Sequence, residues 1–188
     1  MSIDITFTLS DEDLEQFEDI VVKARNLVQE TDNESAVMDE AKKMIEQTRH
    51  GNLPGFINER LLKLGTLLEM VQDEEWKLEE EERRGILAAL SYFALCDDLI
   101  PDHIPGVGFL DDALYAEIII QELDSELRSY KEFCQFRSAE ENRRINRGLD
   151  PKIGREDWLA DKRSVLHSRM RARRTGDRSG HRWRAGIL

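Results

Sequence analysis

Four aspartates lie close together in a short segment that also contains prolines and glycines. They are Asp98, Asp102, Asp111 and Asp112. Carboxylate oxygens are the ligands that Mg²⁺, Mn²⁺ and Ca²⁺ prefer, so one hypothesis is a divalent-metal site that polarises a phosphate or a water molecule. The alternative is that each aspartate caps a helix or forms a turn beside proline and glycine. The spacing favours this alternative, because it matches no known ligand motif.

Two apolar helical segments must position this loop. Ile86, Leu90 and Phe93 recur at helical spacing before it, and Pro101 predicts the end of that helix. The second helix is predicted to begin with Asp111 or Asp112 as its N-cap. The residues expected to shape the turn between the helices are Pro101, Pro105, Gly106 and Gly108.

The loop carries a resemblance to a known family. Residues 98–112 match the pattern D-x-I-P-D-x-I-P-x-x-G-x-x-D-D, which resembles the signature of the YkvA-like family, a bacterial family of unknown function. The resemblance covers residues 85–125 and implies a helix–loop–helix without an established activity. Many relatives look membrane-associated, but here Glu117, Glu122 and Asp124 interrupt the second helix. No stretch reaches the ~20 apolar residues of a membrane span, so we expect a soluble variant without a transmembrane segment.

The net charge of −12 is divided unevenly along the chain. Residues 1–136 hold 12 Lys and Arg against 32 Asp and Glu, a net charge of −20, whereas residues 137–188 hold 15 against 7, a net charge of +8. This asymmetry predicts a basic C-terminal region that binds a polyanion or folds back on the acidic part of the chain.

The residues of this basic region that could bind a partner are Arg169, Arg171, Arg173, Arg174, Arg182, Trp183 and Arg184. Packing on the acidic surface of the same or a neighbouring subunit is the favoured interpretation. Binding of nucleic acid through phosphate contacts and base stacking is possible, as is contact with an anionic membrane surface. Neither is favoured, because no nucleic-acid-binding motif is present and the apolar stripe of this helix is narrow.

Apolar residues at helical spacing predict the core. One predicted helix places Val37, Ala41, Met44 and Ile45 inward, and the next begins near Pro54. The inward stripe of that next helix is Ile57, Leu61, Leu64, Leu68 and Val71, widened by Phe56, Leu67 and Met70. The acidic run 73–84 could be an acidic binding surface, but a solvated helix face or the start of a helix is the favoured interpretation. Trp76 and Leu78 are expected to attach this run to the body of the protein.

The predicted fold class is all-α. We expect a compact bundle of five to seven helices with a short N-terminal strand or extended arm at Ile3–Leu9 and a peripheral basic C-terminal helix. The predicted domain organisation is an acidic helical domain at 1–136, a linker at 137–154, and a basic helix with a flexible tail at 155–188.

Composition limits the function classes. The two cysteines, Cys96 and Cys134, are too few for a disulfide framework, and the N-terminus does not resemble a signal peptide, so we expect a cytoplasmic protein. The sequence contains no phosphate-binding loop, dinucleotide fingerprint or nucleophile elbow. We therefore predict a non-catalytic interaction or scaffold protein with a protein partner or a second copy as its ligand. A metal-dependent enzyme is the less favoured alternative.

Overall fold

Helices make up most of the chain that the structure describes. The computed structural model describes residues 34–50, 54–91 and 110–177. They form six helices, which are α2 (Glu34–His50), α3 (Gly55–Gln72), α4 (Glu80–Leu90), α6 (Leu110–Glu122), α7 (Asp124–Asn146) and α8 (Arg155–Asp177). No strand occurs in these ranges, so the predicted all-α class is confirmed for them. The predicted N-terminal strand lies outside the described residues.

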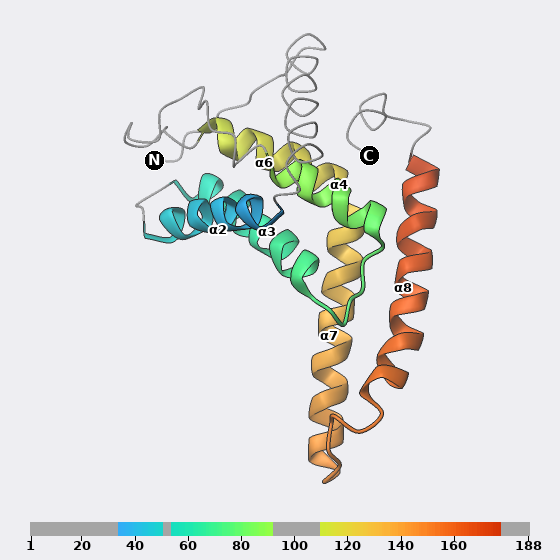
Figure 1. The fold of residues 1–188 in the computed structure, drawn as a ribbon. Coiled ribbons are helices and arrows are strands. Elements are labelled where there is room, and N and C mark those ends of the chain that lie inside the picture. Colours follow the sequence, from blue (N-terminus) through green and yellow to red (C-terminus); the bar gives the residue numbers. More distant parts are fainter. Residues whose placement is uncertain (1–33, 51–53, 92–109, 178–188) are drawn as a thin grey trace, which may run out of the picture.

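The six helices form a body and a projecting hairpin (Figure 1). In the body, α3 packs against α6 and α2, and α2 also packs against α4. Helices α7 and α8 run antiparallel side by side and extend away from the other four helices. The turn between α7 and α8 therefore lies at the end of the molecule opposite α2 and α6.

The predicted stripes of α2 and α3 form the centre of the core. All four inward residues of α2 are buried, as are seven residues of α3. Burial of an Ile or Leu side chain contributes about 1.5–3 kcal/mol relative to an exposed position, so these stripes hold the two helices together. Phe56, which was expected to widen the α3 stripe, is 48% exposed in the first turn of that helix.

The loop between α3 and α4, residues 73–79, joins the body to the hairpin. Trp76 is fully buried, with its ring 5.0 Å from that of Phe133 in α7 and 4.3 Å from that of His167 in α8. Asp73 Oδ1 accepts hydrogen bonds from the backbone N–H groups of Glu75 and Trp76, which fixes the turn that presents Trp76. Trp76 is buried as predicted, but its ring contacts attach the acidic run to the hairpin helices α7 and α8.

Two sequence-based boundaries differ from the structure. Helix α6 begins at Leu110, so Asp111 and Asp112 lie inside its first turn and neither is the N-cap. Asp112 is buried there, a position that the capping pattern does not foresee. Residues 137–146, placed in the predicted linker, form the C-terminal part of α7, and the non-helical segment is 147–154.

Candidate functional site

The predicted metal-binding loop lies almost entirely outside the described residues. This holds for Asp98 and Asp102, for the side chain of Asp111, and for the four turn residues Pro101, Pro105, Gly106 and Gly108. Within the described ranges no group of three or more His, Cys, Asp or Glu side chains could hold a metal ion. The hypothesis of a divalent-metal site therefore stays a prediction.

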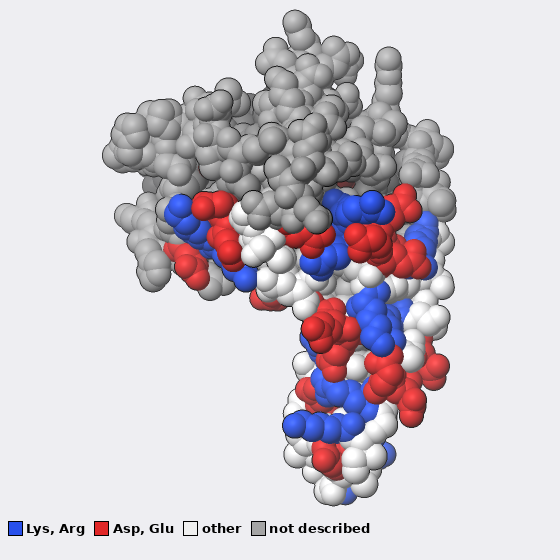
Figure 2. Space-filling model, in the orientation of Figure 1, with Lys and Arg blue, Asp and Glu red and all other residues white. Residues whose placement is uncertain are grey.

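The basic residues of α8 contact acidic residues of the same chain. Lys162 and Arg169 both pair with Glu132 of α7, at 2.6 and 3.1 Å. Arg171 pairs with Glu79 and Glu82 at the start of α4, at 2.8 and 2.9 Å. The space-filling view shows the resulting alternation of positive and negative side chains (Figure 2). The side chain of Arg174 and residues 182–184 lie outside the described part of the chain.

A buried cluster surrounds His167 in the middle of α8. Glu82 is only 4% exposed and accepts a hydrogen bond from Nε of Arg171, while Nη2 of Arg171 lies 3.4 Å from Nδ1 of His167. Burial lowers the pKa of His167 despite the opposing charge of Glu82. The neutral imidazole is thus the form that fits between Trp76 and α4.

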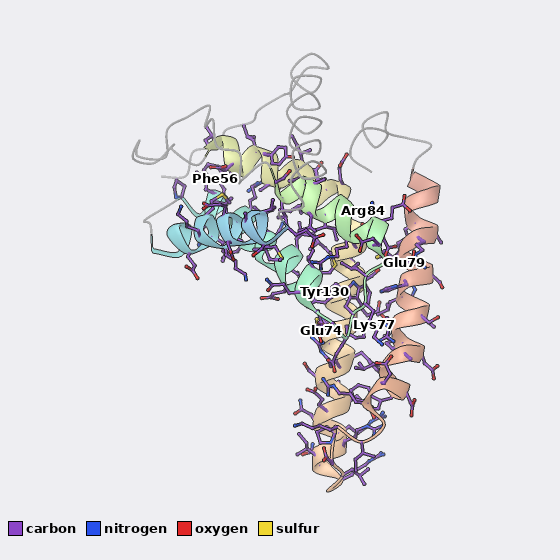
Figure 3. All side chains as sticks on the ribbon, viewed as in Figure 1. Phe56, Glu74, Lys77, Glu79, Arg84 and Tyr130 are labelled. Atoms are coloured by element: carbon purple, nitrogen blue, oxygen red, sulfur yellow. The ribbon has the colours of Figure 1, made fainter. Side chains whose placement is uncertain are left out.

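A second charged network fixes the hairpin to the 73–79 loop. Nη1 of Arg137 lies 2.7 Å from Asp73 Oδ2 and 2.9 Å from Glu75 Oε2, and the Tyr130 hydroxyl donates to the same Asp73 oxygen at 3.0 Å. Hydrogen bonds from Arg155 lower the pKa of the Glu75 carboxyl. In Figure 3, Glu74, Lys77 and Glu79 mark the course of this loop, with Tyr130 beside it on α7. The loop is therefore held by both helices of the hairpin.

The hairpin tip, residues 145–153, has the opposite character. Its three aliphatic side chains point away from the core: Ile145 is 57% exposed, Leu149 54% and Ile153 71%. Elsewhere in the described chain the exposed large hydrophobic residues are Phe56, Leu62 and Val165, one or two on a helix. The tip is thus a local concentration of exposed apolar side chains.

Backbone hydrogen bonds order this tip. The N–H of Gly148 donates to the carbonyl of Ile145 at 2.9 Å, and that of Leu149 donates to the carbonyl of Arg144 at 3.0 Å. With Gly148 at φ +69°, this is the Schellman arrangement that ends many helices. An apolar residue in the position of Leu149 frequently packs back on the helix in this motif. Here it is exposed instead.

The tip also carries positive charge. Arg147 and Lys152 are exposed and form no ion pair with another described residue, whereas Arg143 and Arg144 both pair with Glu140. Asp150 is the one acidic residue between positions 145 and 153, and its Oδ1 accepts the backbone N–H of Lys152 at 2.8 Å. Figure 2 shows the tip at the lower end of the molecule, where uncharged and basic side chains predominate.

Sequence reasoning treated the tip as part of a linker because of Gly148, Pro151 and Gly154. The available signal was the spacing of Ile145, Leu149 and Ile153, which recur every four residues through a segment rich in turn formers. In a solvated linker such regularly placed aliphatic residues have no core to contact, so this spacing is the signal that could have marked an exposed apolar patch.

Comparison with known proteins identifies one similarity. The family model described as "Protein of unknown function (DUF1232)" matches residues 83–116, which include the Pro- and Asp-rich loop and its flanking helix ends. The resemblance to a family of unknown function is thus confirmed, although this description does not carry the YkvA-like name. No curated protein matches the chain, and neither does any solved structure.

The described helices were also compared with the requirements of a membrane span. None of those within 34–50, 54–91 and 110–177 is long and apolar enough to cross a bilayer.

Proposed function

We propose that this chain is a non-catalytic interaction protein that uses the hairpin tip as its contact surface. The observation that carries this proposal is the exposure of Ile145, Leu149 and Ile153 together on an ordered turn. Exposed apolar groups that are rigidly presented lose little conformational entropy on binding, which favours contact with a ligand.

Most basic residues of α8 are paired within the chain, although Arg173 is exposed and pairs with no described residue. Arg155, Lys162, Arg163, Arg169 and Arg171 of α8 all form ion pairs with acidic residues of this chain. Their charges serve to hold α8 on the 73–79 loop, α4 and α7. Arg147 and Lys152 at the tip have no such partner among the described residues, so their charges are available to a ligand.

The architecture suits a scaffold. The body buries its apolar stripes in α2, α3 and α6, and two charged networks fix the hairpin to that body. The tip is therefore held at a defined place on the molecule. A ligand bound at the tip would therefore be held at a fixed position relative to the body. Any second ligand bound elsewhere on the body would be held at a fixed position relative to the first.

In-cell photocrosslinking tests this function. A photoreactive amino acid is placed at Leu149 in the full chain, and at the exposed Glu69 of α3 as the matched control. Illumination should give discrete adducts, to protein or to lipid, at position 149 and none at position 69. Mass spectrometry of the purified chain would identify the adduct. Equal labelling at both positions, or none at position 149, would contradict the proposal.

A further inference from the structure

We propose that the ligand of the hairpin tip is the surface of an anionic lipid bilayer. This inference rests on the proposed function and names the partner class of the same surface. The observation that supports it is a group of exposed aliphatic side chains beside two cations. The aliphatic residues are Ile145, Leu149 and Ile153, and the cations, Arg147 and Lys152, pair with no described residue. Apolar side chains that enter the boundary between headgroups and acyl chains, flanked by Lys and Arg that meet acidic headgroups, are typical of peripheral membrane contacts.

The shape and size of the tip favour lipid over a protein partner. A standard protein interface uses about 20–30 residues and about 800 Å² on each side. The tip offers nine residues at the end of a projecting hairpin. A bilayer requires no complementary groove and accommodates a small convex insertion, so the tip matches the geometry of a membrane contact better.

The residue types at the tip lead to the same conclusion. The residues that dominate binding energy in protein interfaces are enriched in Trp, Tyr and Arg, and Leu is under-represented among them. All three exposed large hydrophobic residues of the tip are aliphatic. Transfer of an aliphatic side chain from water to an apolar phase is favourable whether or not that phase is ordered. Fluid acyl chains provide such a phase.

The distribution of charge allows this approach even though the whole chain has a net charge of −12. Arg137 of α7 contacts the 73–79 loop, and Ile145 lies eight residues further along the same helix. At 1.5 Å per residue, the distance between them along the helix axis is about 12 Å. That separation exceeds the Debye length of about 8 Å at physiological ionic strength. Near the tip, Glu140 and Glu141 are paired with Arg143, Arg144 and Arg155. Asp150 lies within the tip, and the Asp157 carboxylate lies beside Gly154 at its edge. Residues 145–153 thus hold two cations, Arg147 and Lys152, against one carboxylate, Asp150, a local net charge of +1.

Vesicle flotation with the full chain tests the inference. The probes are vesicles of phosphatidylcholine alone and vesicles that also contain phosphatidylserine. The wild-type chain should float with the second kind much more strongly than with the first. The triple variant Ile145→Ser, Leu149→Ser, Ile153→Ser should bind at least about tenfold more weakly. Each of Arg147→Gln and Lys152→Gln should weaken binding about fivefold.

Two control variants assign any binding to the tip. The double variant Phe56→Ser, Leu62→Ser removes exposed apolar side chains from α3 and should leave flotation unchanged. The double variant Arg182→Gln, Arg184→Gln tests the C-terminal tail and should also bind like the wild type. All variants should keep the wild-type thermal unfolding midpoint, because each replaced side chain at the tip and on α3 is exposed.

Three results would overturn the inference. One is a wild-type chain that floats with neither vesicle, and another is flotation that survives the triple tip variant. The third is self-association in light scattering that the triple tip variant abolishes, because it would make a second copy the ligand. If flotation fails while photocrosslinking at position 149 yields a discrete protein adduct, the proposed function stands and only its lipid partner is wrong.

Discussion

Arg171 and Arg173 lie two residues apart on α8 and have different surroundings. The Arg171 guanidinium bridges Glu79 and Glu82 and lies next to His167, whereas Arg173 is exposed and pairs with no described residue. Glu82 is buried, and its carboxylate would lose a charged partner if Arg171 were removed. An uncompensated buried carboxylate is much more costly than an exposed one. The two arginines therefore form a matched pair for measuring how α8 is held.

Arg171→Ala should lower the free energy of unfolding by about 1–3 kcal/mol, because it leaves Glu82 without that partner. Arg173→Ala should change it by less than about 0.5 kcal/mol, as is usual for an exposed residue. Urea unfolding of both variants at neutral pH provides the comparison. Adding Glu82→Gln, which keeps a glutamine in the capping box with Glu79, should recover part of the loss. Equal losses in the two arginine variants would show that this contact does not hold the helix.

At the scale of elements, Trp76 is an aromatic contact between the 73–79 loop and both helices of the hairpin. Its indole packs on Tyr130 and Phe133 of α7 and on His167 of α8, although it belongs to a short loop that follows α3. No other fully buried side chain of the described loops has comparable volume. The packing of the 73–79 loop on α7 and α8 thus relies on this side chain.

Trp76→Ala should destabilise the protein by about 3–5 kcal/mol, the cost of truncating a large buried aromatic side chain. The loss should be greatest in the hairpin. Native-state hydrogen exchange should show faster exchange of the α8 amides, with a smaller change in α2 and α3. Phe56→Ala is the control, because it removes an aromatic ring that is half exposed. Equal acceleration in all helices would indicate that body and hairpin unfold as a single unit.

The sequence predicts well which residues form helices and which of their faces are buried. It predicts poorly which helices pack against one another. The stripes of α2 and α3 are correct because helical spacing alone decides which residues share a face. In α8 helical spacing groups Leu159, Leu166 and Met170, which are fully buried, with Val165, which is 53% exposed. Asp112 was expected to cap α6 and lies in its first turn instead.

The candidate site was less predictable for a physical reason. Glu82 and Arg171 are 89 residues apart in the chain, and no local pattern states which of many carboxylates an arginine will meet. The basic composition of residues 137–188 favoured folding back on an acidic surface, and within the described part of α8 Arg169 and Arg171 form such ion pairs. The tip was missed because glycine, proline and aspartate mark a turn equally well whether its aliphatic neighbours are buried or exposed.

At the scale of the whole molecule, the two oppositely charged parts of the chain meet along α8. Glu75 and Glu132 each accept hydrogen bonds from basic residues of α8, and these bonds lower the pKa of both carboxyl groups. Both side chains are partly exposed to water, 32% for Glu75 and 43% for Glu132, so each pair alone contributes little. Below the pKa of these carboxyl groups, the ion pairs are lost together. As the carboxylates are protonated, the positive charges of the 27 Lys and Arg and the four His are no longer neutralised.

The signs of these pKa shifts predict a stability that declines in two steps as the pH falls. Burial lowers the pKa of His167, so its contribution is complete above the ordinary histidine pKa of about 6.5 and is lost as the pH falls through the folded-state value. Glu82 on α4 opposes this shift, while Arg163 and Arg171 on α8 reinforce it. The contributions of Glu75 and Glu132 are complete above about pH 4.3 and are lost below it.

Urea unfolding between about pH 7.5 and pH 3.5 separates the two steps in variants. His167→Phe keeps a ring against Trp76 but cannot be protonated, so its stability should stay level through the first step and fall only in the second. Glu132→Gln should retain the first step and show a shallower second one. If the profile of His167→Phe ran parallel to that of the wild type, the charged imidazole would be tolerated between Trp76 and α4. The decline would then come from the carboxylates alone, and α8 would be held against acid by its surface ion pairs and its narrow apolar face.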